Sequence, residues 1–106
     1  MYAEERRLVI TTLPTQEQVD RIASDLAPDV VHIRMRVGYD WSDHPAIYFR
    51  VILSDEASQR DRLLEVIQRV RGMVRNELGF DELEHYPYFR FRSKSEQAQL
   101  RDPAWE

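Results

Sequence analysis

The stretch VHIRMRVGYDWSDHPAIYFRVIL, residues 31–53, carries the clearest indication of how this chain folds. Apolar residues occupy every second position in residues 31–37 and again in residues 47–53. This period of two places alternate side chains on opposite faces of a β-strand. Between the two runs lie Gly38, two aspartates and a proline, which are typical of a turn. The stretch therefore predicts an antiparallel hairpin with a long connecting loop.

A helix is expected on each side of the hairpin. Residues 15–26 repeat apolar side chains at helical spacing, and Thr15 with Gln18 has the spacing of a capping box. Residues 58–78 carry a second apolar stripe, and Gly79 suits the left-handed position that closes a helix. The side chains expected in the two stripes are Val19, Ile22, Ala23, Leu26, Leu63, Leu64, Val66, Ile67, Val70, Met73, Val74 and Leu78.

Three further segments complete the predicted order. The sequence YPYFRFR, residues 86–92, alternates phenylalanines with tyrosine and arginines, which predicts a third strand. Ser93 with Glu96 has capping-box spacing, which predicts a short helix after that strand. Residues 8–12, LVITT, are rich in β-branched side chains and form a candidate first strand.

The predicted order is (β)αββαβ(α) in a single α+β domain that spans residues 1–106. Two amphipathic helices covering one face of an antiparallel-rich sheet make a two-layer sandwich. If residues 8–12 join the sheet, the pattern is the ferredoxin-like split βαβ arrangement. Without that strand, the order suits other small two-layer folds.

The composition indicates one globular domain, because the 106 residues are 42% hydrophobic and 32% charged. The chain has no cysteine, so disulfides, thiolate metal sites and a cysteine nucleophile are excluded. No apolar run approaches the roughly 20 residues that a membrane helix needs, and the first residues lack the pattern of a secretory signal. These features predict a cytoplasmic protein that does not associate with membranes.

The charge of the chain is unusual in its make-up. Its net value is −4, which argues against a general nucleic-acid coat protein, since nonspecific binding relies on an overall cationic surface. The basic residues are fourteen arginines and one lysine, Lys94. Arginine recognises carboxylates and phosphates through two parallel hydrogen bonds, although genomic base composition also explains such a bias. Only the placement of the arginines separates these explanations.

Asp40, Asp43 and His44 gather in the predicted hairpin loop and raise the question of a metal site. Hard cations need several oxygen ligands. The next acidic pair, Asp55 and Glu56, follows the second strand, so about 12 residues at roughly 3.3 Å each separate it from Asp43. Aspartates in loops commonly accept hydrogen bonds from nearby backbone N–H groups. We therefore predict a structural loop, with no metal ligands, no catalytic residues and no cofactor.

The layout of residues 15–92 resembles a minimal nucleotidyltransferase domain, in which a Gly-Ser follows the first strand and an Asp-x-Asp begins the second. In VGYDWSDHPAIYFRVIL, Gly38 stands at the first point and Asp43 at the second. Tyr39 replaces the serine that cradles phosphate, and Pro45 replaces the second carboxylate. A single carboxylate cannot hold the metal arrangement that two-metal phosphoryl transfer requires.

The resemblance therefore implies a nucleotidyltransferase-like domain that has lost catalysis. Small proteins of that family commonly act as antitoxins, each paired with a helical HEPN-type RNase toxin. The resemblance thus implies a protein partner of this kind. A metal-dependent nucleotidyltransferase that recruits its metal with Asp40 and Asp43 is an alternative hypothesis.

The polar face of the predicted sheet is the strongest candidate for a functional surface. Its side chains, which alternate with the apolar ones, are His32, Arg34, Arg36, Tyr48, Arg50, Tyr88, Arg90 and Arg92. No acidic residue is among them, although the chain as a whole is acidic. Like charges repel when they are directly opposed on neighbouring strands, so this face calls for counter-charge.

Three interpretations of this face are open. The face is solvated, or neutralised within the chain by residues 3–5 or by the C-terminal helix. It binds an acidic surface of a protein partner, since arginine and tyrosine are enriched at interface hot spots. It binds single-stranded RNA or DNA, whose bases stack on aromatic rings.

We favour the second interpretation and expect a non-catalytic, antitoxin-like interaction module. Trp41 in the hairpin loop belongs to the same prediction, because a large aromatic ring in a loop either packs on the domain or anchors a partner. Self-association through this face would need acidic groups from elsewhere. The residues predicted to bind the partner are Arg34, Arg36, Trp41, Tyr48, Arg50, Tyr88, Arg90 and Arg92.

Overall fold

The computed structural model describes residues 13–79 and 84–106. In chain order its elements are helix α2 (Gln16–Asp25), strand β1 (Val30–Tyr39), strand β2 (Pro45–Leu53), helix α3 (Arg60–Leu78), strand β3 (Tyr86–Ser93), helix α4 (Lys94–Leu100) and the 3-10 turn η2 (Pro103–Trp105). The α+β prediction is confirmed for this part of the chain. The candidate strand at residues 8–12 lies outside the described residues.

The three strands form one mixed sheet in the order β1-β2-β3. β1 and β2 make the predicted antiparallel hairpin, in which Val37 is opposite Ile47. β3 runs parallel to β2 and places Tyr88 opposite Tyr48, with α3 as the crossover helix. β2 and β3 are direct neighbours, so the described strands form an ordinary βαβ unit rather than a split one.

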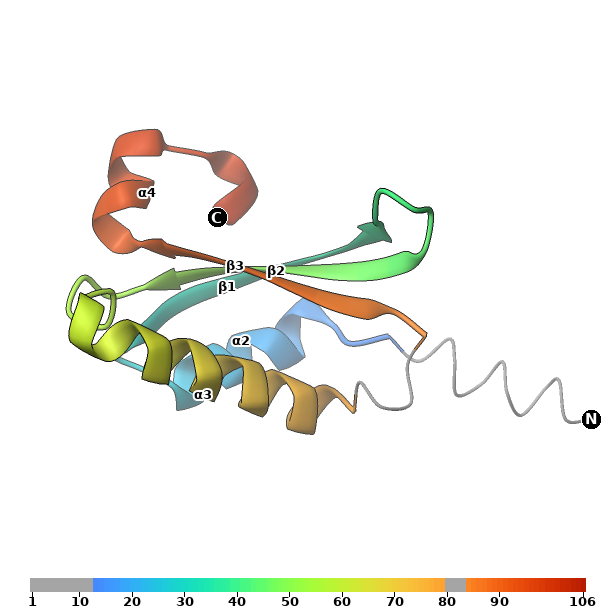
Figure 1. Cartoon of the computed structure of the whole chain (residues 1–106), viewed down its shortest axis with the longest axis horizontal. Coiled ribbons are helices and arrows are strands. Elements are labelled where there is room, and N and C mark those ends of the chain that lie inside the picture. The colour runs from blue at the N-terminus through green and yellow to red at the C-terminus, as the bar shows by residue number, and fades with distance from the viewer. Residues whose placement is uncertain (1–12, 80–83) are drawn as a thin grey trace, which may run out of the picture.

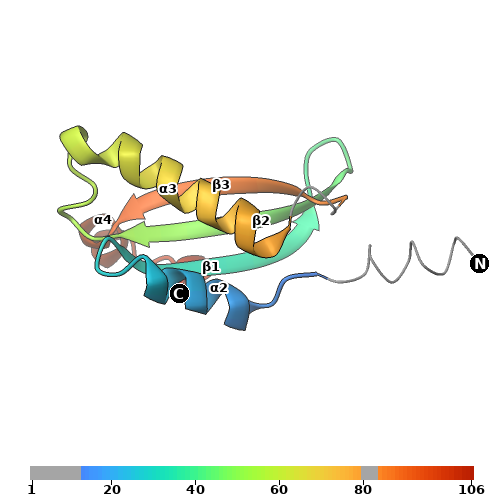
Figure 2. The same ribbon diagram turned by 90° about the horizontal axis from the view of Figure 1, so that it is seen from below.

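The helices lie in layers on the two faces of this sheet. α2 and α3 cover one face, as seen from below the sheet in Figure 2. α4 and η2 lie over one end of the opposite face, and the hairpin loop rises at the other end (Figure 1). Helices thus cover most of one side of the sheet and only one end of the other side (Figure 1 and Figure 2).

The hydrophobic core fills the space between the sheet and the two long helices. Apolar residues at alternate strand positions meet apolar residues at helical spacing, as the sequence predicts. The Phe49 ring at the centre stacks on Phe89, with the ring centroids 5.2 Å apart. The core residues include Val19, Ile22, Ala23, Leu26, Ile33, Ile47, Phe49, Val51, Leu53, Val66, Val70 and Val74.

Two residues predicted in the core of β1 are instead exposed. The pairing of β1 with β2 shifts between Val30 and His32, so Val30 is buried and Val31 is 47% exposed. Val37 is 41% exposed because it lies beyond the start of α2. The start of α2 lies beside the middle of β1. There the Gln16 side chain donates to the Ile33 carbonyl and accepts from the backbone N–H of Met35.

The prediction for Leu64 on α3 is wrong as well, since its side chain is 67% exposed. The buried stripe of α3 runs through Val66, Val70 and Val74. Consecutive residues of an α-helix are rotated by about 100°, so Leu64 points away from that stripe. Both capping boxes are confirmed, and Gly79 adopts the left-handed conformation with φ 63°.

Charged groups fix the two ends of the connection from β2 to α3. Asp29 accepts hydrogen bonds from Arg62 at 2.8 Å and from Arg69 at 2.6 Å, which ties α3 to the turn before β1. The hydrogen bond from Arg62 lowers the pKa of Asp29. Asp55 accepts from both the backbone N–H and the hydroxyl of Ser95, which anchors the start of α4 beside the end of β2.

Candidate functional site

The strand register arranges the predicted polar face in three rows across the sheet. A residue of β1 is opposite one of β2, which in turn is opposite one of β3. From the hairpin loop toward the other end of the sheet, the rows are Arg36–Tyr48–Tyr88, Arg34–Arg50–Arg90 and His32–Ile52–Arg92. The three rows differ in what lies on top of them.

Residues 94–106, here named the 94–106 segment, cover the row that ends in Arg92. The Arg92 guanidinium lies 4.0 Å from the centroid of the Trp105 ring, donates to Gln97 Oε1 at 2.8 Å and is 3.7 Å from Asp102. His32 Nε2 is 3.0 Å from the backbone oxygen of Glu106. The chain itself therefore supplies a ring, an amide and a carboxylate to this arginine.

The middle row consists of Arg34, Arg50 and Arg90, and it has no such cover. None of the three forms an ion pair with a carboxylate within residues 13–79 and 84–106. Arg50 donates to the backbone oxygen of Ala104 at 3.5 Å, which marks the border of the 94–106 segment. Three like charges at directly opposed positions repel one another, so this row favours an anionic ligand.

The third row, nearest the hairpin loop, is an aromatic floor. The rings of Tyr48 and Tyr88 stack with centroids 5.4 Å apart, and the Arg36 guanidinium lies 5.1 Å from the Tyr48 ring. The Tyr86 ring is 4.9 Å from that of Tyr88. The Tyr48 hydroxyl donates to the Tyr39 carbonyl at 2.8 Å, so both the hydroxyl and the face of this ring have contacts that fix its orientation.

Asp40 organises the hairpin loop above this floor. Its carboxylate accepts from the Ser42 hydroxyl and backbone, from the His44 backbone and from the Tyr88 hydroxyl, at distances between 2.8 and 3.1 Å. The hydrogen bond from the Ser42 hydroxyl is the largest cause that lowers the pKa of Asp40, to about 2. Desolvation and the bond to Asp40 raise the pKa of Tyr88 to about 12. Hydrogen bonds to Asp40 therefore order the loop, which is the structural role predicted for its aspartates.

Trp41 stands at the tip of this loop and is 87% exposed. Its ring meets Tyr88 edge-on, with the centroids 6.2 Å apart. Trp105, by contrast, is only 4% exposed. Of the two tryptophans, Trp41 is the one displayed to the surroundings, at the rim of the aromatic floor.

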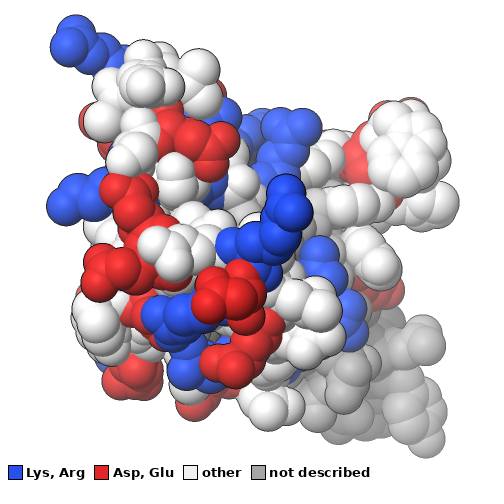
Figure 3. Space-filling model, turned by 60° about the vertical axis from the view of Figure 1, so that its left-hand side comes forward, with Lys and Arg blue, Asp and Glu red and all other residues white. Residues whose placement is uncertain are grey.

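A groove of about 440 Å³ lies over the aromatic floor and over Arg50 and Arg90 of the middle row, and its lining includes Arg36, Tyr48, Arg50, Tyr88 and Arg90. This hollow is named the groove below. The 94–106 segment and the hairpin loop lie at opposite ends of the sheet face that carries these residues (Figure 1). None of the carboxylates in the described parts of the chain lines it. At the end of the molecule near α4 and the start of α3, by contrast, acidic and basic side chains are interspersed (Figure 3).

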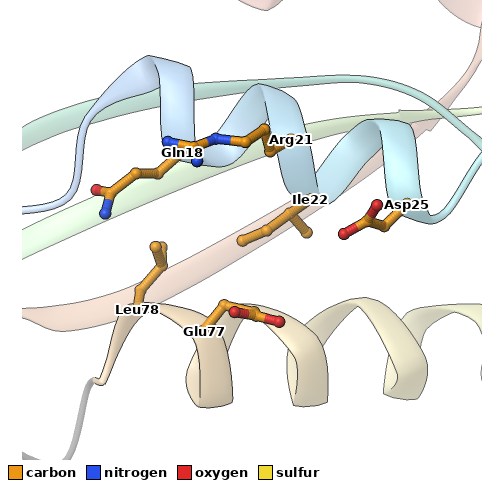
Figure 4. A pocket seen from close by; sticks show the side chains of 6 residues that line it. All are labelled: Gln18, Arg21, Ile22, Asp25, Glu77 and Leu78. Carbon is orange, nitrogen blue, oxygen red and sulfur yellow. The ribbon is translucent and has the colours of Figure 1, made fainter.

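A second hollow of about 190 Å³ lies between α2 and α3. Ile22 and Leu78 face each other across it, and charges of both signs surround them (Figure 4). Arg21 there is 3.7 Å from Glu17 of its own helix. This hollow therefore does not favour a ligand of either charge, and the groove is the better candidate for a binding site.

The groove unites five of the eight residues predicted from the sequence. Arg34 is opposite Arg50 in the middle row, and Trp41 lies against Tyr88 at the rim. Arg92 is separate, because its side chain is 18% exposed beneath the 94–106 segment. Tyr86, which is 55% exposed, was not among the predicted residues, although the same alternation that marks Tyr88 includes it.

Among the described residues, Asp40, Asp43 and His44 of the hairpin loop do not form a recognisable group of metal ligands. No group of three or more His, Asp or Glu side chains suited to a metal ion occurs in the described parts of the chain. Gly38 lies within β1 and Asp43 in the loop, where Asp43 is exposed and has φ 64°. Asp40 is occupied by the hydrogen bonds of the turn.

Comparisons with protein-family models, with curated proteins and with solved structures find no match to this chain. Within the described residues, no helix is long and apolar enough to cross a membrane.

Asp40 should stay ionised in the folded protein to about pH 2. Because its folded pKa lies below the ordinary 3.8, its contribution to stability is present above pH 3.8 and is lost as the pH falls through about 2. A ¹³C NMR titration of the carboxyl carbons measures this midpoint. Ser42→Ala should raise the midpoint more than Tyr88→Phe does, since the Ser42 hydroxyl is the larger cause. A wild-type midpoint near the ordinary value would contradict this account of the loop.

Proposed function

We propose that this protein is a non-catalytic interaction module that binds an acidic segment of a partner protein in the groove. The observation that carries the proposal is the row Arg34–Arg50–Arg90, whose three charges have no carboxylate partner in the described chain. A bound carboxylate relieves their repulsion and gains bidentate hydrogen bonds from guanidinium groups. The neighbouring tyrosines and Trp41 supply the aromatic anchors typical of interface hot spots.

Single-stranded nucleic acid is the second candidate, because arginines beside exposed rings also bind phosphates and bases. Trp41 and Tyr86, both largely exposed, favour it. Two observations weigh against it. The net charge of −4 repels the long, evenly charged backbone of a nucleic acid more strongly than a short acidic segment of a protein. Tyr48 and Tyr88 already stack on each other, and each hydroxyl is bonded, so their faces are partly occupied.

The resemblance to antitoxin-type nucleotidyltransferase domains suggests which protein the partner is. We propose a HEPN-type RNase toxin as the first candidate for co-expression, where the neighbouring reading frame encodes one. In that case the complex should form with the wild-type chain and fail with the groove variants described next.

The proposal is tested with the purified chain and a fluorescein-labelled octapeptide of alternating glutamate and aspartate. Fluorescence anisotropy should show binding, and the double variant Arg50→Glu, Arg90→Glu should weaken it by at least about tenfold, because two attractive contacts become repulsive. The matched control is Arg21→Glu, Arg60→Glu, which changes net charge equally on exposed helix positions. Circular dichroism verifies that each variant is folded.

An oligouridylate of similar length is titrated in parallel. Affinity for the peptide that is equal in the groove variant and in the control variant would contradict the proposal. Tighter binding of the oligouridylate, with a steep loss between roughly 50 and 300 mM salt, would assign the groove to nucleic acid instead.

A further inference from the structure

The row that ends in Arg92 serves as an internal example of peptide recognition by this face, because the 94–106 segment of the same chain packs on it. The segment leaves β3 at Ser93 and turns back over the sheet, as Figure 1 shows. Its anchor is Trp105, and its sequence around that ring, Asp102 to Glu106, reads DPAWE. An acidic stretch with one aromatic ring therefore occupies one end of the arginine-rich face.

Three kinds of contact hold this stretch. The Arg92 guanidinium packs over the indole ring at 4.0 Å and faces the Asp102 carboxylate at 3.7 Å. Arg50 and His32 meet the backbone oxygens of Ala104 and Glu106. Cation–π contact, ion pairing and backbone recognition thus converge on one short segment. Arginine is suited to all three, since its planar guanidinium both stacks and forms bidentate bonds.

The next row repeats the same chemistry without an occupant from the described chain. Arg90 precedes Arg92 by two residues on β3, so both side chains lie on the same face of the sheet. Arg50 and Arg34 extend the row across β2 and β1. Beyond it lies the aromatic floor of Tyr48 and Tyr88. A second acidic segment with an aromatic ring could therefore contact the Arg90 guanidinium, the two further arginines of this row and the aromatic floor.

From this we infer that the preferred ligand of the groove is an acidic peptide segment of a partner protein that carries an aromatic ring, with the ring stacked on the Arg90 guanidinium as Trp105 is on Arg92. The carboxylates of the segment pair with Arg34 and Arg50. This inference rests on the proposed function and adds the requirement for a ring. Charge complementarity and the repeated arginine position are what support it.

The test compares two labelled peptides on the full chain, Asp-Glu-Asp-Trp-Glu-Asp-Glu and the same peptide with alanine in place of tryptophan. The tryptophan peptide should bind about tenfold more tightly, the size of a well-formed cation–π contact. Arg90→Lys keeps the charge but removes the planar stacking group. In this variant the ratio between the peptides should fall to about two, while binding of the alanine peptide changes by less than about threefold. Arg50→Lys, the control, should preserve the ratio.

The possible outcomes separate the inference from the proposed function. If both peptides bind equally to the wild type, and both lose affinity in the Arg50→Glu, Arg90→Glu variant, the ring requirement is wrong and the acidic-partner function stands. An undiminished ratio in Arg90→Lys would overturn the stacking position. If neither peptide responds to any groove variant, the proposed function itself fails. Binding of an oligouridylate alone would overturn both.

Discussion

Replacing Phe49 with alanine is expected to lower the free energy of unfolding by about 3–5 kcal/mol, the usual cost of emptying a buried phenylalanine site. Phe49 is 0% exposed at the centre of the middle strand and stacks on Phe89 at 5.2 Å. Both neighbouring strands and the two long helices close around this position, so little relaxation can fill the cavity. Urea unfolding followed by circular dichroism measures the loss.

The control for this variant is Phe49→Leu, which retains most of the volume and should cost much less. Such hydrophobic exchanges that approximately conserve volume typically cost under about 1.5 kcal/mol. Since Phe49 points to the helix side of the sheet, folded Phe49→Leu protein should bind acidic peptide like the wild type. A loss below about 1 kcal/mol for Phe49→Ala would show that the core is less tightly packed than described.

Replacing Trp105 with alanine is expected to release the 94–106 segment from the sheet, at a cost of about 3 kcal/mol. Trp105 is 4% exposed and is the anchor that places Asp102 near Arg92. Release exposes Arg92 and adds a fourth cation beside the groove. Acidic-peptide affinity should therefore rise by roughly the few-fold that one exposed ion pair contributes.

Hydrogen exchange measured by NMR reports on this release directly. The backbone N–H of Arg101, which bonds to the Gln97 carbonyl at 2.8 Å, should lose protection in Trp105→Ala, whereas that of Val70 in α3 should not. Trp105→Phe retains a ring for Arg92, so the protection of the Arg101 N–H in this variant should lie between that in the wild type and that in Trp105→Ala. Unchanged protection at Arg101 would mean that α4 is held by its capping box and by Ser95 alone.

Local patterns in the sequence were sufficient for most of the secondary structure. The capping boxes at Thr15 and Ser93, the left-handed Gly79 and the alternation of the hairpin all depend on residues within a few positions of each other. The errors at Val31 and Leu64 have a common cause. A bulge that shifts the strand register, and the rotation of a helix about its axis, are set by the partner element and not by the local pattern.

The acidic composition and the arginine-rich sheet face without acidic residues follow from the local sequence, because alternation along a strand sets which residues share a face. The division of that face into covered and open rows depends on the tertiary structure. Parallel pairing of β3 with β2 aligned Arg90 with Arg50, and the return of the 94–106 segment covered Arg92 while leaving the middle row open. Both outcomes depend on contacts between residues far apart in the chain, and no local periodicity encodes them.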